Sequence, residues 1–257
     1  MKNMQAPNLF VSFSDVKNKP LNFEMDFELQ QNDITIYSVH LPDFLELKNE
    51  LYQMLNSNEQ NKANSFHDET DQNQFIIYRA LMKMLLAAYT KLAAKSISFD
   101  YTITKKPFLA SHPEIHFNLS HAHNFAAFAI SKKPIGIDIE FMADDFNFSC
   151  LFPNIFHDHE IFNIESSLNQ KKTFYTYWTR KEAFVKALGK GIDDDFKNIP
   201  CVEGPHTINT TMIKNHKNWQ VNSFELTNAY LGAIAFEEVT STPIKIAHYS
   251  IPNTLNF

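Results

Sequence analysis

Phe75-Ile-Ile-Tyr-Arg-Ala-Leu-Met-Lys83 in the first half of the chain has a counterpart in the second half, Phe174-Tyr-Thr-Tyr-Trp-Thr-Arg-Lys-Glu182. Each stretch is predicted to be helical, and a two-strand unit follows each of them, around residues 117–130 and 224–236. The repeated helix–strand–strand order predicts two pseudo-equivalent lobes joined near Lys132-Lys-Pro134. On the pattern alone, a chance recurrence of this order stays open as the alternative.

The expected fold class is α+β, with each lobe packing a small, mostly antiparallel sheet on a long helix. Residues 1–132 are expected to form the N-terminal lobe and residues 133–257 the C-terminal lobe. Alternating apolar residues predict strands, and a 3.6-residue period predicts helices. The expected strands cover residues 34–40, 97–104, 116–120, 126–131, 135–140, 218–226 and 229–237. The expected helices cover residues 45–55, 75–89, 150–164 and 173–188. Ser57 is expected to cap a short helix through Phe66, with Gln60 in the capping box, and Gly189 to end the last helix.

Composition excludes several function classes. The 257 residues carry a formal net charge of −6 and no long basic block, which argues against a nucleic-acid partner. Two cysteines exclude a disulfide framework and a Cys-rich zinc site. The five glycines cannot be arranged as a dinucleotide-binding or P-loop motif, so any phosphate must be held by a metal ion and cationic side chains. There is no secretory leader pattern and no apolar run of membrane-spanning length, so we expect a cytoplasmic globular protein without a membrane partner.

The strand Ile135-Gly-Ile-Asp-Ile-Glu140 carries the first candidate site. Asp138 and Glu140 are two residues apart, so their side chains share one face of the strand, while the isoleucines face a core. Two neighbouring carboxylates repel unless a cation or a proton lies between them, and oxygen ligands suit a hard ion such as Mg²⁺. The pair alone also fits a plain polar face of a sheet.

Glu182 and Lys186 lie one turn apart on the second long helix, one turn after Trp178. This pattern has two equally good interpretations. The pair could be a surface ion pair, or Glu182 could be a third metal carboxylate beside a phosphate-binding ammonium of Lys186. His121, at the end of a strand, is suited to donate a hydrogen bond to an anion, and a structural role is its alternative. His157-Asp-His159 lacks a third ligand at a zinc spacing, so we expect no zinc site there.

Four segments together resemble one family. They occur in the order Lys106-Pro-Phe-Leu109, Phe117-Asn-Leu-Ser-His121, Gly136-Ile-Asp-Ile-Glu140 and Trp178-Thr-Arg-Lys-Glu-Ala-Phe-Val-Lys-Ala-Leu-Gly-Lys-Gly191. In this order they look like the successive signatures of the 4'-phosphopantetheinyl transferase superfamily, in its two-lobed, surfactin-synthetase-activating (Sfp-type) form. The resemblance spans residues 57–191 and continues more weakly towards residue 257.

The resemblance implies a fold, a reaction and a set of partners. The fold is the pseudo-duplicated transferase fold. The reaction transfers the 4'-phosphopantetheine arm of coenzyme A to a serine of an apo acyl or peptidyl carrier protein, with Mg²⁺, and releases adenosine 3',5'-bisphosphate. The two-lobed length implies a monomer. The alternatives are a non-catalytic homologue that binds coenzyme A or the carrier protein, and a metal-dependent phosphoesterase.

The resemblance also implies residue roles. Asp138, Glu140 and Glu182 would bind the metal, Lys186 would contact the α-phosphate, and Glu160 would be a base, with Glu182 or a water as rivals. The implied coenzyme A contacts are Lys62, Arg79, Lys83, Lys106, Ser120, His121 and Lys186. Two positions depart from the family pattern: Lys105 stands where a glycine is usual, and Asn73-Gln74 stand where arginine is common. Arg79 and Lys83, one turn later, are expected to substitute for that arginine.

Overall fold

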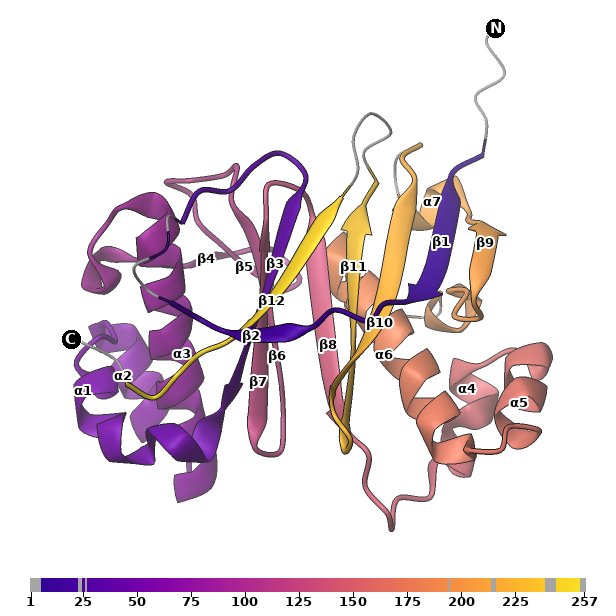
Figure 1. Cartoon of the computed structure of the whole chain (residues 1–257), viewed down its shortest axis with the longest axis horizontal. Coiled ribbons are helices and arrows are strands. Elements are labelled where there is room, and N and C mark those ends of the chain that lie inside the picture. Colours follow the sequence, from indigo (N-terminus) through magenta and orange to yellow (C-terminus); the bar gives the residue numbers. More distant parts are fainter. Residues whose placement is uncertain are drawn as a thin grey trace, which may run out of the picture.

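Two five-stranded sheets lie between the long helices α3 and α6 in the computed structural model (Figure 1). The structure describes residues 6–22, 25, 27–193, 195–213, 216–238 and 244–254. The first sheet has the strand order β2 (Asn18–Pro20), β12 (Lys245–Ser250), β3 (Asp33–His40), β7 (Phe125–Ser131) and β6 (His116–Ala122). The second has the order β8 (Ile135–Phe141), β11 (Tyr230–Glu237), β10 (Trp219–Thr227), β1 (Asn8–Phe13) and β9 (Gly204–Thr207).

The helices cover the outer faces of the sheets, and a small hairpin lies apart from both. The α-helices are α1 (Lys48–Tyr52), α2 (Ser57–Asn64), α3 (Glu69–Thr90), α4 (Phe152–Ile155), α5 (Asp158–Glu165), α6 (Gln170–Leu188) and α7 (Thr210–Ile213). The 3₁₀ turns are η1 (Leu41–Leu47), η2 (Ala94–Ser96), η3 (Phe148–Leu151) and η4 (Phe196–Asn198). The hairpin pairs β4 (Asp100–Tyr101) with β5 (Pro107–Phe108). Among the described residues, no helix has the length and apolar character needed to cross a membrane.

The same unit occurs twice. In the first sheet, β3 leads to α3 and then to the hairpin β6–β7, and β3 pairs antiparallel with β7. In the second sheet, β8 leads to α6 and then to the hairpin β10–β11, and β8 pairs antiparallel with β11. This duplication confirms the expected α+β fold class, because the two segments compared in the sequence lie in α3 and α6.

Each end of the chain adds a strand to the sheet of the opposite half. β1 pairs in parallel with β10, and β12 pairs in parallel with β3 (Figure 1, indigo β1 beside the orange strands). The expectation that residues 1–132 and 133–257 build separate sheets therefore needs correction at both ends. The change from one core to the other between β7 and β8 lies close to the expected boundary.

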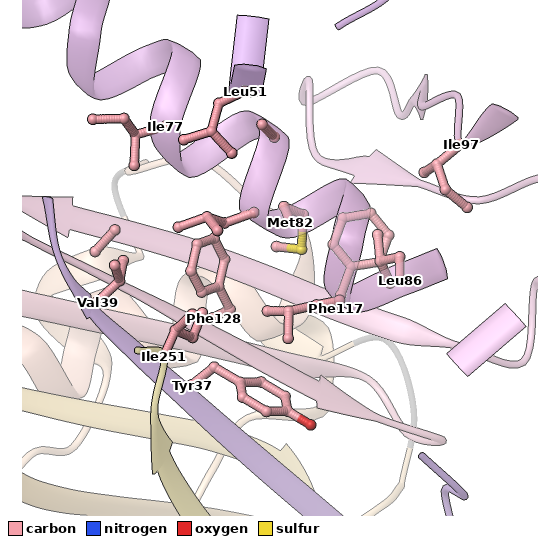
Figure 2. Close-up of a cluster of buried hydrophobic side chains, with 14 of the residues drawn as sticks. Tyr37, Val39, Leu51, Ile77, Met82, Leu86, Ile97, Phe117, Phe128 and Ile251 are labelled. Atoms are coloured by element: carbon pink, nitrogen blue, oxygen red, sulfur yellow. The ribbon is translucent and has the colours of Figure 1, made fainter. Parts of the chain in front are cut away.

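Strand alternation places apolar side chains on both faces of each sheet. In β3, Tyr37 and Val39 face the helix α3, while Ile34 and Ile36 face the second sheet. Figure 2 shows the core under α3, where Leu51, Ile77 and Met82 of the helices meet Phe117 and Phe128 of the sheet. The isoleucines of β8 lie in the core between the two sheets, as the sequence predicts. Both faces of β8 are therefore covered, one by the first sheet and the other by α6.

Three local predictions were wrong. Asn56, not Ser57, caps α2, and the capping box uses Glu59, whose backbone N–H donates to the Asn56 side chain at 3.0 Å. The strand expected over 97–104 is reduced to β4, because the chain turns back at Lys105. The helix expected over 150–164 is interrupted by extended backbone at Phe156, which separates α4 from α5.

Lys105 adopts a left-handed backbone conformation, with φ of 63°. This conformation costs a non-glycine residue about 1 kcal/mol. Its occurrence here gives a physical reason for the glycine that the resemblance expects at this position. The lysine tolerates the turn and adds a charge to the β4–β5 hairpin.

Candidate active site

Helix α6 lies directly against strand β8 because both elements carry small side chains at the point of contact. A Cβ atom added to Gly136 would lie 2.1 Å from the carbonyl oxygen of Ala183 and 2.3 Å from the backbone nitrogen of Ala187. The glycine and the two alanines therefore let the two backbones approach closely. This approach brings the polar face of β8 under the polar stripe of α6.

Two hydrogen bonds fix how the helix is aligned with the strand. The indole nitrogen of Trp178 donates to Glu140 at 3.0 Å, and the ammonium of Lys186 donates to Asp138 at 2.6 Å. Helix and strand therefore run in opposite directions. Glu182 lies on the same helix face, midway between Trp178 and Lys186, so it faces the same strand. We call Asp138, Glu140, Glu182 and Lys186 the carboxylate site.

Asp138 is a buried carboxylate with only one oxygen engaged. Oδ1 accepts hydrogen bonds from Ser120 Oγ at 2.9 Å and from Lys186 Nζ at 2.6 Å. Oδ2 is buried and has no hydrogen-bond partner. A buried charged oxygen without a partner is unfavourable by more than an ordinary hydrogen bond, so this atom marks a place for a ligand.

The two glutamates of the site both have a raised pKa. Burial, and next the charge of Asp138, raise the pKa of Glu140 to about 7. The same two causes raise the pKa of Glu182 to about 7. The three carboxyl groups are therefore close enough to repel one another, as the sequence analysis expects of a site awaiting a cation.

These groups fit a hard divalent ion, although they do not form a complete coordination shell by themselves. Among the described residues, no three His, Cys, Asp or Glu side chains are clustered tightly enough to enclose a metal. The reason lies in the contacts above, since Lys186 holds Asp138 and Trp178 holds Glu140. Mg²⁺ typically takes only one or two protein carboxylates and fills its shell with water and phosphate. The free Asp138 oxygen and the purely oxygen donor set meet that requirement.

Strand β6 closes the edge of β8 with side chains instead of backbone. The side-chain oxygen of Asn118 accepts from the Ile137 N–H at 2.8 Å, and Ser120 Oγ accepts from the Ile139 N–H at 3.3 Å. Asn118 and Ser120 are two residues apart, so both point to β8. The site therefore lies at the seam between the two sheets. Asn118 is not among the site residues predicted from the sequence, although the Asn-Leu-Ser alternation contains the signal.

His121 follows on the same strand and is exposed at the seam. Its ring stacks on Tyr78 of α3, with centroids 4.9 Å apart and planes inclined by 15°. Partial burial, and next the charge of Lys186, hold the pKa of His121 below its ordinary value. Lys186 is thus close enough to influence both His121 and the carboxylates, which places the expected anion contact beside the carboxylate site.

A basic pocket lies on the first lobe. It has a volume of about 450 Å³ and is lined by Asn56, Asn58, Glu59, Lys62, Phe75, Arg79, Phe99, Tyr101 and Lys105. The guanidinium of Arg79 lies 4.8 Å from the ring centroid of Phe99, and the ammonium of Lys62 lies 5.2 Å from that of Phe75. Two cations beside aromatic rings, with Lys105 as a third basic side chain in the lining, suit a nucleotide with phosphate groups. Lys62 and Arg79 are thus brought together, and Lys105 joins them.

Three residues expected in the site lie elsewhere, and each is a correction. Lys83 has no exposed side-chain surface and forms an ion pair with Glu59 at 2.9 Å, so it is not available to coenzyme A. Glu160 is 1% exposed and pairs with the buried Lys181 at 3.0 Å. A general base must reach the proton that it takes, so this environment gives Glu160 a structural role. Lys106 directs its ammonium to backbone carbonyls of the second half.

Another cavity lies on the second lobe. It has about 660 Å³ and is lined by another face of α6, including Thr176 and Arg180. Its Arg180 already pairs with Glu203 at 3.1 Å, and its Lys172 pairs with Glu225. These charges are therefore paired within the protein, whereas the carboxylate site contains the unpartnered Asp138 oxygen.

Comparisons with known proteins agree with this fold. Residues 134–235 match the family described as the 4'-phosphopantetheinyl transferase superfamily. Residues 45–133 match the family described as 4'-phosphopantetheinyl transferase, N-terminal. The two matches are adjacent and together contain every residue of the carboxylate site. The chain belongs to the 4'-phosphopantetheinyl transferase superfamily.

Individual relatives carry the same description. The 4'-phosphopantetheinyl transferase HetI of a Nostoc species is 31% identical over 149 residues, which cover 56% of this chain and 63% of HetI. A 4'-phosphopantetheinyl transferase of Bacillus subtilis is 29% identical over 161 residues, covering 61% of this chain and 71% of that protein. Sfp of Bacillus subtilis is 23% identical over 206 residues, covering 77% of this chain and 90% of Sfp. Against HetI, the match spans less than two thirds of the relative's length.

Proposed function

We propose that this chain transfers the 4'-phosphopantetheine arm of coenzyme A to a serine of an apo acyl or peptidyl carrier protein. Adenosine 3',5'-bisphosphate is the other product. The observation that carries the proposal is the carboxylate site, where the unpartnered Asp138 oxygen and two further carboxyl groups lie beside Lys186. Membership in the transferase superfamily supports the same reaction.

Asp138, Glu140 and Glu182 would hold a Mg²⁺ ion. When bound, the ion neutralises the charge of the coenzyme A diphosphate and polarises its phosphoryl oxygens. The negative charge of three neighbouring carboxyl groups also means that phosphate is not attracted to this site without a cation. Magnesium therefore accounts for groups that the protein itself leaves unsatisfied.

Cationic side chains orient the substrate on both sides of the carboxylate site. Lys186 is 28% exposed, so its ammonium is free to turn from Asp138 to a phosphate oxygen. His121 lies beside it and is suited to donate to the 3'-phosphate. Lys62 and Arg79 line the basic pocket, where their aromatic neighbours suit the nucleotide. Ser120 keeps Asp138 in place.

The reaction needs alignment and charge neutralisation more than covalent chemistry. The fixed contact between α6 and β8 supplies the alignment, because it holds four charged side chains on two rigid elements. Glu182 and a water molecule are the two candidates for accepting the proton of the carrier serine. One chain supplies both sheets and the seam between them, so the proposal includes a monomer, and light scattering measures its molar mass. The proposal also includes a cytoplasmic location.

The experiment mixes the protein, MgCl₂, coenzyme A and an apo carrier protein and follows the carrier by mass spectrometry. A gain in carrier mass equal to the arm supports transfer. Release of free phosphopantetheine without a gain in mass indicates a phosphoesterase instead. Binding of coenzyme A with neither product indicates a non-catalytic homologue. Omission of Mg²⁺ in the presence of a chelator should abolish the mass gain.

A further inference from the structure

Lys106 connects the first half of the chain to the two elements that carry the carboxylate site. Its ammonium donates to the carbonyl oxygen of Ile135 at 2.9 Å, of Lys186 at 2.6 Å and of Ala187 at 3.4 Å. Ile135 is the first residue of β8, and the other two lie in the last turn of α6. One side chain therefore joins the start of the strand to the end of the helix.

A second side chain of the same hairpin reaches the same place. Thr104 Oγ1 donates to the carbonyl oxygen of Gly189 at 2.6 Å. The backbone N–H of Lys106 is held by Thr102 Oγ1 at 3.1 Å, which fixes the turn from which both side chains project. The β4–β5 hairpin is thus docked on the C-terminus of α6 by two independent contacts.

The chemistry of a helix end explains why a lysine is suited to this position. The last carbonyls of a helix lack partners within the helix, and they carry its partial negative charge. A cation placed there donates hydrogen bonds to these carbonyls and interacts favourably with the partial negative charge. Burial lowers the pKa of Lys106 to about 8, so the ammonium is largely desolvated yet still mostly charged at neutral pH. An ammonium committed to three carbonyls has little capacity left for a nucleotide.

We propose that Lys106 is a positioning residue that clamps the last turn of α6 to the start of β8. The clamp sets the separation between the helix that carries Lys186 and the strand that carries Asp138. It acts at the same end of the contact as Gly136, where a Cβ atom on the strand would collide with backbone atoms of the helix. Its effect on catalysis rests on the proposed function, whereas its effect on the helix end does not.

The test compares three variants of the full-length protein. Lys106→Met keeps the aliphatic stem and removes the donors, and Lys106→Arg keeps a charged donor. Lys95→Met is the matched control, since Lys95 is an exposed lysine on η2 outside both the site and the clamp. Amide hydrogen exchange followed by mass spectrometry reports on residues 183–190, and the carrier assay gives kcat and KM for coenzyme A.

In Lys106→Met, we expect exchange in the last turn of α6 to rise about tenfold and kcat to fall about tenfold, with KM for coenzyme A changed less than about threefold. Lys106→Arg should keep most of the exchange protection in the last turn of α6 and most of kcat. Lys95→Met should match the wild type in both measurements. The proposal is overturned if exchange is unchanged in Lys106→Met. It is also overturned if KM alone rises, because that pattern identifies a ligand contact.

Two further outcomes remain informative. If Lys106→Met does not fold, Thr104→Val replaces it, and unchanged exchange at residues 183–190 in that variant overturns the docking of the hairpin. If the wild-type protein transfers no arm, the proposed function fails, while the exchange measurement still decides whether the clamp exists.

Discussion

Asp138 occupies a position that favours binding over stability. Its Oδ1 atom is held by Ser120 and Lys186, but its Oδ2 atom is buried without a partner. Folding alone gains nothing from such an atom, because its desolvation is not compensated. Groups of this kind are expected where a protein keeps a site ready for a charged ligand.

Asp138→Asn should separate the two contributions. We expect transfer to fall by about 100-fold or more, since the site loses a full charge. The free energy of unfolding should change by less than about 1 kcal/mol, because the asparagine oxygen still accepts from Ser120 and Lys186, and the weaker ion pair is offset by less repulsion from Glu140 and Glu182. Urea unfolding and the carrier assay measure the two effects. The exposed Asp15→Asn is the matched control, and near-normal turnover of Asp138→Asn would remove Asp138 from the site.

At this scale the sequence predicts the face on which a side chain lies better than the partner that a flexible side chain reaches. The alternation of β8 was enough to place Asp138 and Glu140 on one face, because Cβ direction follows from the strand itself. Lys83 and Lys106 are expected as coenzyme A contacts and Glu160 as a base, but each side chain reaches a partner elsewhere in the chain. A flexible side chain's partner depends on tertiary structure, which local pattern does not contain.

At the scale of elements, the contact between α6 and β8 is the feature that assembles the site. Gly136 faces backbone atoms of the helix, so no side-chain movement can make room for a larger residue. The sequence contained the glycine and the alanines, and it correctly placed a long helix and a strand around them. It could not show that these two elements touch at this point.

Gly136→Ala should therefore displace the helix from the strand. We expect the free energy of unfolding to fall by about 3 kcal/mol, with a loss of transfer of about tenfold or more in the protein that remains folded. Gly191→Ala is the matched control, because nothing lies within 4 Å of a Cβ atom added there. Equal stability of the two variants in urea would contradict the close packing of α6 on β8.

His248 makes the attachment of β12 sensitive to pH. It is 2% exposed, and its Nε2 atom lies 2.9 Å from Ser38 Oγ in β3. Burial lowers the pKa of His248 to about 4. The native state therefore holds the neutral ring, while the unfolded state binds a proton near the ordinary histidine pKa of about 6.5.

Stability should consequently decrease as the pH falls from about 6.5 towards 4, by about 3 kcal/mol in total from this group. Above that range the ring is neutral in both states, and its contribution is constant. Urea unfolding at about pH 7 and about pH 5 measures the slope. His248→Gln keeps a polar partner for Ser38 and should reduce the slope, and an unchanged slope would exclude His248 as its source.

The whole molecule is held together by the exchange of its end strands. Leu9 of β1 pairs with Trp219, and Ile246 of β12 pairs with Ile34. The duplicated helices and hairpins are local and could be predicted from the sequence, whereas the two end strands could not. Parallel pairing between segments some 210 residues apart leaves no local signal, because each strand gains its partner only in the finished fold.

The exchange predicts that the two halves unfold together. Neither sheet is complete without a strand from the other half, so loss of one half removes part of the other. Scanning calorimetry of the full chain should give a single transition whose calorimetric and van't Hoff enthalpies agree. Two resolved transitions would show that residues 1–132 and 133–257 behave as independent domains.

The place of β12 also affects how the protein is made. This strand is inserted between β2 and β3, so the first sheet cannot be completed until the ribosome has added residue 250. Until then the long apolar strand β3 has an unpaired edge in the nascent polypeptide, and such an edge is open to pairing with other chains. β1 is therefore synthesised well before its partner β10, and β12 is synthesised well after its partner β3.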